Sequence, residues 1–104
     1  LLPGSQEPQK IQFLGLFLYF MSAMYYVYVI QSIPTGKLYK GFTQNLNQRL
    51  KEHNLGKSKY TKAFIPWKIV YVETVESRDQ ARKREKYFKT AAGRRFIKNK
   101  LQSN

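Results

Sequence analysis

The 104-residue sequence has no cysteine, one histidine, one tryptophan and only six acidic residues. Without cysteine, the chain can form neither a disulfide framework nor a cysteine-based zinc site. The lack of disulfides is compatible with a cytoplasmic protein. Six acidic residues leave few candidates for a catalytic or metal-binding carboxylate. The length allows one domain with a modest core.

The scarcity of acidic residues makes the chain strongly basic, since 19 Lys and Arg residues give a formal net charge of +13. A small domain with this imbalance repels itself, and a polyanionic partner relieves the repulsion. Nucleic acid fits this role because neutralised phosphates release counterions. Charge alone says nothing about chemistry, so a small ribosomal or chromosome-coating protein is the alternative at this point.

The N-terminal 23 residues differ in character from the rest of the chain. Residues 1–10 are polar and contain two prolines and a glycine, so we expect them to be disordered or loosely attached. Residues 11–30 form a mostly apolar run, long enough on its own to span a membrane. Its second half is needed as a strand, so no membrane partner is expected.

We therefore expect one domain over residues 24–102, preceded by an extension over residues 1–23. The extension is interpreted as non-native or translated from upstream of Met24. A short hydrophobic anchor or signal-like segment is the alternative.

Residues 26–41 predict a β-hairpin, because runs rich in Val, Ile and Tyr flank a Pro-Thr-Gly turn. Side chains alternate between the faces of a strand, so Tyr28 and Tyr39 can point the same way. If the register brings these residues together, two phenols meet across the strands. Gly41 then leaves space beside them for backbone or substrate.

Residues 45–54 predict a helix, because a polar residue at 43 or 45 can cap its start and Gly56 can end it. His53 lies on the apolar stripe of this helix, and Arg49 lies at the edge of that stripe. We expect both side chains to border a cleft. The alternative is that Arg49 belongs to the basic surface and His53 closes the helix end.

The following segment predicts a basic, aromatic loop and then a strand. In the loop, lysines alternate with aromatic residues, which suits phosphate contact and base stacking. A solvated loop with one tucked aromatic ring is the alternative. The candidate nucleic-acid contacts here are Lys57, Lys59, Tyr60 and Lys62. Residues 67–75 are nearly all apolar around their middle, which predicts a central strand covered on both faces.

A helix from the Ser77–Gln80 capping box to about residue 89 contains the most informative acidic residue. Among the six acidic residues, we expect only Glu85 to lie both on an inward face and in a plausible site. A carboxylate in this position costs free energy unless it meets a cation or a metal ion. Glu85 is therefore predicted to bind a metal ion, and a structural salt bridge is the alternative.

A last helix over residues 91–101 presents its basic residues outward, which suits electrostatic attraction of DNA or RNA. Outside the loop, the expected nucleic-acid contacts are Lys40, Arg82, Arg94 and Arg95.

Several short motifs together resemble one enzyme family. They are Tyr26-Val27-Tyr28, Tyr39-Lys40-Gly41-Phe42-Thr43, Arg49-Leu50-Lys51-Glu52-His53-Asn54, Pro66-Trp67-Lys68-Ile69-Val70-Tyr71 and Arg84-Glu85-Lys86. Over residues 24–101 the chain is similar to the GIY-YIG nucleases, in particular to small free-standing bacterial members related to the catalytic module of the nucleotide-excision-repair excinuclease. The resemblance implies an α/β (α+β) domain with a mainly antiparallel three-stranded sheet flanked by helices.

The resemblance also implies a divalent-metal-dependent endonuclease acting on DNA, although it does not separate DNA from RNA. Glu85 would bind a single Mg²⁺ or Mn²⁺ ion, and Arg49 would hold the scissile phosphate. Tyr39 would be the general base, with nearby positive charge lowering the pKa of its phenol, and Tyr28 would position Tyr39 or the water. His53 could act as the base instead, or relay the proton of Tyr39. A non-catalytic nucleic-acid-binding module with the same fold is the rival interpretation.

Overall fold

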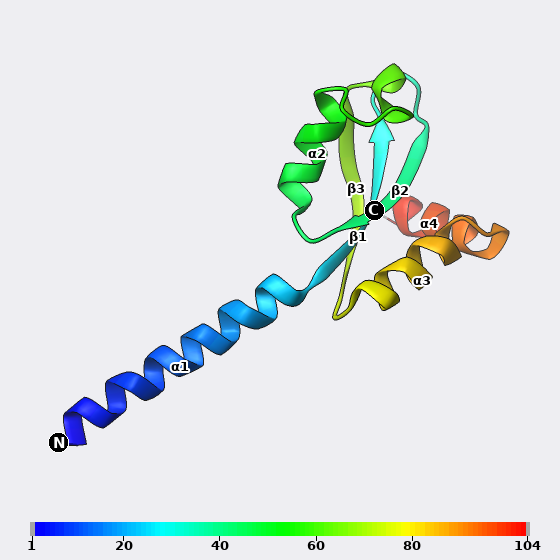
Figure 1. Ribbon diagram of the computed structural model, residues 1–104. Coiled ribbons are helices and arrows are strands. Elements are labelled where there is room, and N and C mark those ends of the chain that lie inside the picture. Colours follow the sequence, from blue (N-terminus) through cyan, green and yellow to red (C-terminus); the bar gives the residue numbers. More distant parts are fainter. Residues whose placement is uncertain (1, 104) are drawn as a thin grey trace.

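The computed structural model describes the backbone of residues 2–103 and the side chains of residues 12–103. Figure 1 shows a small domain from which one long helix projects. In chain order the elements are α1 (Leu2–Ala23), β1 (Tyr25–Ser32), β2 (Leu38–Thr43), α2 (Leu46–Asn54), the 3₁₀ helix η1 (Thr61–Phe64), β3 (Trp67–Val75), α3 (Arg78–Phe88) and α4 (Ala91–Gln102).

The three strands form one sheet in the order β2-β1-β3, and both strand pairs are antiparallel. This confirms the predicted α+β fold with a three-stranded antiparallel sheet and flanking helices. The prediction that residues 67–75 form the central strand is wrong, because β1 is central and β3 is an edge strand. Helices can cover both faces of an edge strand as well as of a central one. A run of apolar residues therefore indicates that both faces are covered, and not where the strand lies in the sheet.

A β-bulge explains the nearly unbroken apolar run of β3. Ile30 pairs with Ile69 and Val29 pairs with Tyr71, which leaves Val70 without a partner. Val70 and Tyr71 therefore both pack toward one face of the sheet, whereas Ile69 packs toward the other.

The sheet separates two apolar clusters, and alternation along β1 assigns its side chains to them. On one face, α3 and α4 cover a cluster of five buried residues: Val27, Val29, Ala81, Phe88 and Ile97. On the other face, α2 and η1 cover a cluster of three buried residues: Tyr28, Ile30 and Trp67. The second face carries a tyrosine in its core, and the polar groups of the candidate site gather around it.

An ion pair fixes α3 to β3. Arg84 Nε and Nη2 each donate a hydrogen bond of 2.8 Å to the carboxylate of Glu73. The Tyr71 hydroxyl also donates to this carboxylate, at 2.7 Å. Arg84 is the main reason that the pKa of Glu73 lies below its ordinary value. The side chain of Glu73 is as well buried as that of Glu85, since the two are 20% and 21% exposed.

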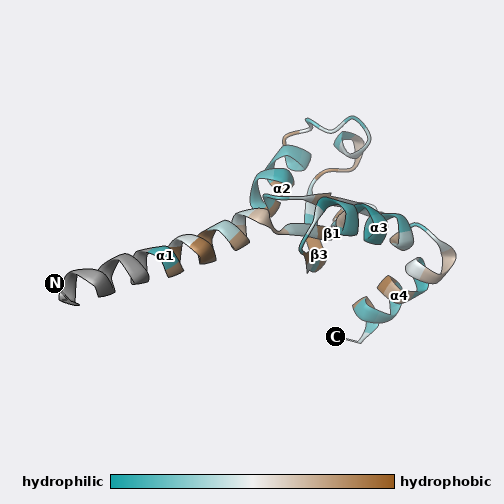
Figure 2. Cartoon of the chain, turned by 60° about the horizontal axis from the view of Figure 1, so that its bottom comes forward, coloured by the Kyte–Doolittle hydropathy of each residue, from teal (hydrophilic) through white to brown (hydrophobic). Residues whose placement is uncertain are grey.

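The sequence predicts that residues 1–10 are disordered or loosely attached, whereas residues 2–10 belong to the long helix α1. Residue 1 lies outside the described part. In Figure 1 α1 extends away from the domain. Hydrophobic residues occur along its described portion, whereas the residues of α3 are mostly hydrophilic (Figure 2). Among the described residues, no helix has the length and apolar character needed to cross a membrane.

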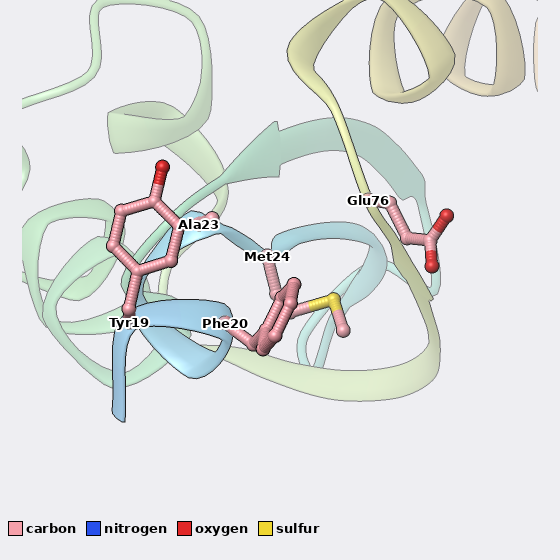
Figure 3. Close-up of a pocket in the computed structure, with 5 residues that line it drawn as sticks. All are labelled: Tyr19, Phe20, Ala23, Met24 and Glu76. Atoms are coloured by element: carbon pink, nitrogen blue, oxygen red, sulfur yellow. The ribbon is translucent and has the colours of Figure 1, made fainter. Parts of the chain in front are cut away.

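The end of α1 and the turn after β3 border a cavity of about 250 Å³. Its lining consists of Tyr19, Phe20, Ala23, Met24 and Glu76 (Figure 3). The lining is mainly apolar and includes none of the predicted catalytic residues. The origin of residues 1–23 stays a prediction.

The connection between α3 and α4 depends on a glycine. The Thr90 hydroxyl caps α4 by accepting a hydrogen bond of 3.1 Å from the Gly93 amide. A Cβ atom at Gly93 would collide with the carbonyl group of Tyr87 and the Cα atom of Phe88. These are backbone atoms, so the clash cannot be relieved by a change of rotamer.

Replacing Gly93 with alanine is expected to lower the free energy of unfolding by about 1–3 kcal/mol, as overpacking does in a close-packed core. Thermal and denaturant unfolding of the full chain measure this loss. The matched control is Gly15→Ala, since a Cβ at Gly15 meets nothing within 4 Å. Equal stability of Gly93→Ala and the parent chain would contradict the tight α3–α4 connection.

Candidate functional site

Two tyrosines of the hairpin lie on the same face of the sheet as diagonal neighbours. Tyr28 of β1 is opposite Gly41, and Tyr39 of β2 is opposite Ile30. The two phenols therefore do not face each other directly. A Cβ atom at Gly41 would lie 2.5 Å from the Tyr28 hydroxyl oxygen. Glycine at this position leaves the space in which the Tyr28 ring crosses β2.

The buried His53 of α2 contacts both tyrosines. Its Nε2 atom forms a hydrogen bond of 2.9 Å with the Tyr28 hydroxyl. Its Nδ1 atom forms a second hydrogen bond of 2.8 Å with the hydroxyl of Thr61 in η1. The Tyr39 ring packs edge-on against the imidazole, with 5.2 Å between the ring centroids. Both ring nitrogens of His53 therefore have a partner, and the side chain has a fixed orientation.

Burial determines the protonation states of His53 and Tyr28. It lowers the pKa of His53 to about 4, and the positive charge of Arg49 acts in the same direction. Burial also raises the pKa of Tyr28, and Arg49 offsets part of that increase. Both groups are therefore neutral near pH 7. Because its pKa is lowered and its side chain is fully buried, His53 is a weaker base than a histidine with the ordinary pKa.

Arg49 lies near the Tyr28–His53 pair, because its charge acts on both groups. Its guanidinium Nη1 donates a hydrogen bond of 2.9 Å to Glu52, three residues later in α2. Arginine has five N–H donors, so this bond occupies only part of the group. The Arg49 side chain remains 33% exposed, so it can receive an anionic group from solvent.

Glu85 lies on α3, which covers the opposite face of the sheet. Its negative charge contributes to the raised pKa of Tyr28, so the two groups are within electrostatic range. The carboxylate accepts a hydrogen bond of 3.1 Å from Lys89, one turn later in the helix. The Lys89 side chain is 57% exposed and, like other lysines, flexible, so an incoming cation can displace it from Glu85.

The donor set suits a hard divalent ion that keeps most of its water. Within the part of the chain described, no three His, Asp or Glu side chains come together as a metal-binding group. Mg²⁺ typically retains several waters and is held by one or two protein carboxylates. A half-buried single carboxylate such as Glu85 fits that requirement.

The predicted nucleic-acid contacts form two separate groups. One is the loop before β3, where Tyr60 stacks on Tyr39 with 5.9 Å between ring centroids and exposed lysines lie at 57, 59 and 62. The other is on the α3–α4 side of the sheet. Burial lowers the pKa of Lys40, and the charges of Arg94 and Lys89 lower it further, so these cations are neighbours. Arg82 and Arg95 are exposed on α3 and α4.

Sequence reasoning missed two polar residues that hold the site. Thr61 is fully buried, binds His53 and accepts a hydrogen bond of 2.9 Å from the Trp67 indole through its carbonyl oxygen. Asn54 pairs with the backbone N–H and C=O of Trp67, at 2.6 and 3.1 Å. No local pattern indicates either contact. The Arg49–Glu52 pair, in contrast, has a helical i,i+3 spacing that could have revealed it.

The lowered pKa of His53 predicts a specific loss of stability in acid. Between pH 6.5 and 4 the unfolded chain binds a proton at this residue and the folded chain does not. The free energy of unfolding should therefore fall by about 3 kcal/mol as the pH decreases through this window. Denaturant unfolding of the parent and His53→Gln proteins at a series of pH values tests this. The variant should lack that part of the slope, and parallel curves would contradict a buried neutral histidine.

Comparisons with known proteins place the chain in a family. The family model described as the GIY-YIG catalytic domain matches residues 24–101. A UPF0213 protein of Bacillus licheniformis is 41% identical over 80 residues, which are 73% of this chain and 81% of the relative. A UPF0213 protein of Clostridium perfringens is 43% identical over 67 residues, covering 64% and 71% of the two chains.

Among solved structures, the solution NMR structure of a UPF0213 protein from Bacillus halodurans is similar. It has a TM-score of 0.46 and 26% sequence identity, and the match covers 73% of this chain and 83% of the other. The match to the family model spans both tyrosines, Arg49, His53 and Glu85. The chain therefore belongs to the GIY-YIG family of nuclease domains.

Proposed function

We propose that the protein is a divalent-metal-dependent endonuclease that hydrolyses phosphodiester bonds in DNA. One observation carries the proposal: Tyr28, Tyr39, His53 and Arg49 meet around one face of the hairpin, with the carboxylate of Glu85 in electrostatic range. Phosphodiester hydrolysis needs an activated water, positive charge for the phosphoryl oxygens and stabilisation of the leaving oxygen. The site offers a candidate for each requirement.

Arg49 and Glu85 would divide the electrostatic work. Arg49 would bind the non-bridging oxygens of the scissile phosphate with the N–H donors that Glu52 does not use. Glu85 would hold Mg²⁺ or Mn²⁺, which when bound supplies Lewis-acid stabilisation of the developing negative charge. Lys89 would leave Glu85 in that state and return to solvent.

The two phenols would have different roles because their environments differ. Tyr28 is 2% exposed, is bonded to His53 and has a raised pKa, so it stays protonated and positions its neighbours. Tyr39 is only partly buried, and within residues 12–103 its hydroxyl is bonded to no other side chain or backbone group. Tyr39 would therefore act as the base in its phenolate form: its hydroxyl proton first leaves to solvent, and the phenolate oxygen then takes the proton from the attacking water. His53, the alternative base, is fully buried, and it is hydrogen-bonded to Tyr28 and packed against the ring of Tyr39.

The second candidate function is a non-catalytic nucleic-acid-binding module. It is favoured by the spread of basic side chains to Lys40 and Arg94, on the sheet face away from the tyrosines. Binding through such a surface needs no metal ion, and it weakens steeply with salt.

The role of Glu85 is tested with labelled duplex, single-stranded, flapped and branched DNA, and with RNA of the same sequence, in Mg²⁺, Mn²⁺ or chelator. Glu85→Gln is expected to lower the cleavage rate by roughly 10²–10³-fold, because one stabilising group at the reacting centre is lost. The matched control is Glu76→Gln, which removes an exposed carboxylate at the turn after β3. The Glu76→Gln protein should cleave at the parent rate.

The same experiment separates the two candidate functions. Salt-sensitive binding of every substrate, with no cleavage by the parent protein in either metal, would establish the binding module. Cleavage that survives in Glu85→Gln and in chelator would refute the assignment of Glu85 as the metal ligand.

The role of Tyr39 is tested by removing its hydroxyl. Tyr39→Phe keeps the ring packing against His53 and should lower the single-turnover cleavage rate by roughly 10²–10⁴-fold, the usual contribution of a general base. Tyr25→Phe is the matched control, because Tyr25 packs in the cluster on the opposite face of the sheet. A Tyr39→Phe protein that retains the parent rate would assign the proton transfer to another group.

A further inference from the structure

Tyr60 is an exposed aromatic residue on a fixed segment. It is 57% exposed, although large aromatic side chains are usually well buried. The residue after it, Thr61, is fully buried and bonded to both His53 and the Trp67 indole. The next amide, that of Lys62, donates a hydrogen bond of 3.0 Å to the Ser58 carbonyl. The exposure of Tyr60 is therefore a result of where the backbone holds it.

One face of the Tyr60 ring is already stacked. Its centroid lies 5.9 Å from that of Tyr39, with an interplanar angle of 28°. Phe64 is tilted against it at 5.8 Å and 54°. Tyr39 therefore stacks on one face of the ring, and more than half of the Tyr60 surface still stays exposed. A planar group bound against this exposed surface would extend the stack that begins at Tyr39.

The charges around the exposed surface of Tyr60 favour one kind of ligand. Lys57, Lys59 and Lys62 are exposed in the same short segment, and no acidic residue occurs between positions 53 and 72. An apolar peptide or a second copy of this basic chain would gain nothing from these lysines. A nucleotide satisfies both features, because its base stacks on the ring and its phosphates neutralise the lysines.

We propose that Tyr60 is a stacking platform for one unpaired nucleobase beside the scissile phosphate. This inference rests on the proposed function, because it places the base next to Tyr39 and so next to the reacting bond. In a duplex, both faces of a base are covered by its neighbours, and it must leave the stack to reach a protein ring. The platform therefore directs cleavage to single-stranded nucleotides and to junctions between single- and double-stranded DNA.

The test measures stacking separately from cleavage. The full chain carrying Glu85→Gln is titrated into DNA with 2-aminopurine in a single strand, in a flap or inside a duplex. The fluorescence of 2-aminopurine falls when it stacks on an aromatic ring, so quenching is expected for the first two substrates. Adding Tyr60→Leu should abolish the quenching and weaken binding of these two substrates by roughly 5- to 150-fold. Duplex affinity should stay unchanged.

Two further variants control for the shape of the site. Tyr60→Phe keeps the ring and should retain quenching and affinity. Tyr19→Leu makes the same substitution as Tyr60→Leu at an exposed tyrosine of α1, 66% exposed and outside the site, and should behave like the parent. If Tyr60→Leu weakens duplex and single-stranded binding equally, or leaves quenching intact, the platform is overturned and Tyr60 only supports Tyr39.

The failure of this inference can be distinguished from the failure of the proposed function. If the protein with Glu85 intact cleaves no substrate, but quenching still depends on Tyr60, the platform stands and the nuclease proposal fails. If cleavage depends on Glu85, but Tyr60→Leu cleaves flapped and duplex DNA in the parent ratio, the nuclease stands and the platform fails.

Discussion

The arrangement of the site depends on the burial of one imidazole between a strand and a 3₁₀ helix. His53 is fully buried and bridges the hydroxyls of Tyr28 and Thr61, which lie in parts of the chain 33 residues apart. Each of these groups would be costly to bury alone, and together they satisfy one another. Because hydrogen bonds are directional, they fix the orientations of the His53 and Tyr28 rings. The partly exposed groups, Tyr39 and Tyr60, then pack on this rigid base.

The two faces of the sheet use electrostatics in different ways. On the α2 face, polar groups are neutral and hydrogen-bonded, and Arg49 is the charged group that acts on both Tyr28 and His53. On the α3–α4 face, Lys40, Lys89 and Arg94 crowd together, and burial with like charge lowers the pKa of Lys40. Such crowding costs free energy in the isolated protein, and a polyanion bound there would remove part of that cost.

Local signals in the sequence predict the elements well, and contacts across the fold account for what they miss. Asn45 and Ser77 cap α2 and α3 as their positions indicate. The edge position of β3 was not predictable, because hydrophobicity reports coverage of a strand's faces and not its hydrogen-bonding neighbours. The Arg84–Glu73 pair and the Thr61–His53 bond join residues 11 and 8 positions apart, on different elements, so no periodicity reveals them.

The bulge at Val70 gives the third strand a tolerance for changes in length. The residues before it, from Trp67 to Ile69, and those after it, from Tyr71 to Val75, already pair with β1 in registers that differ by one residue. Loss of the unpaired residue would bring both halves into one continuous ladder without turning either to the opposite face. Trp67 would keep its place beside Tyr39, and Glu73 would keep its place beside Arg84. A variant that lacks Val70 should therefore preserve both the tyrosine cluster and the attachment of α3.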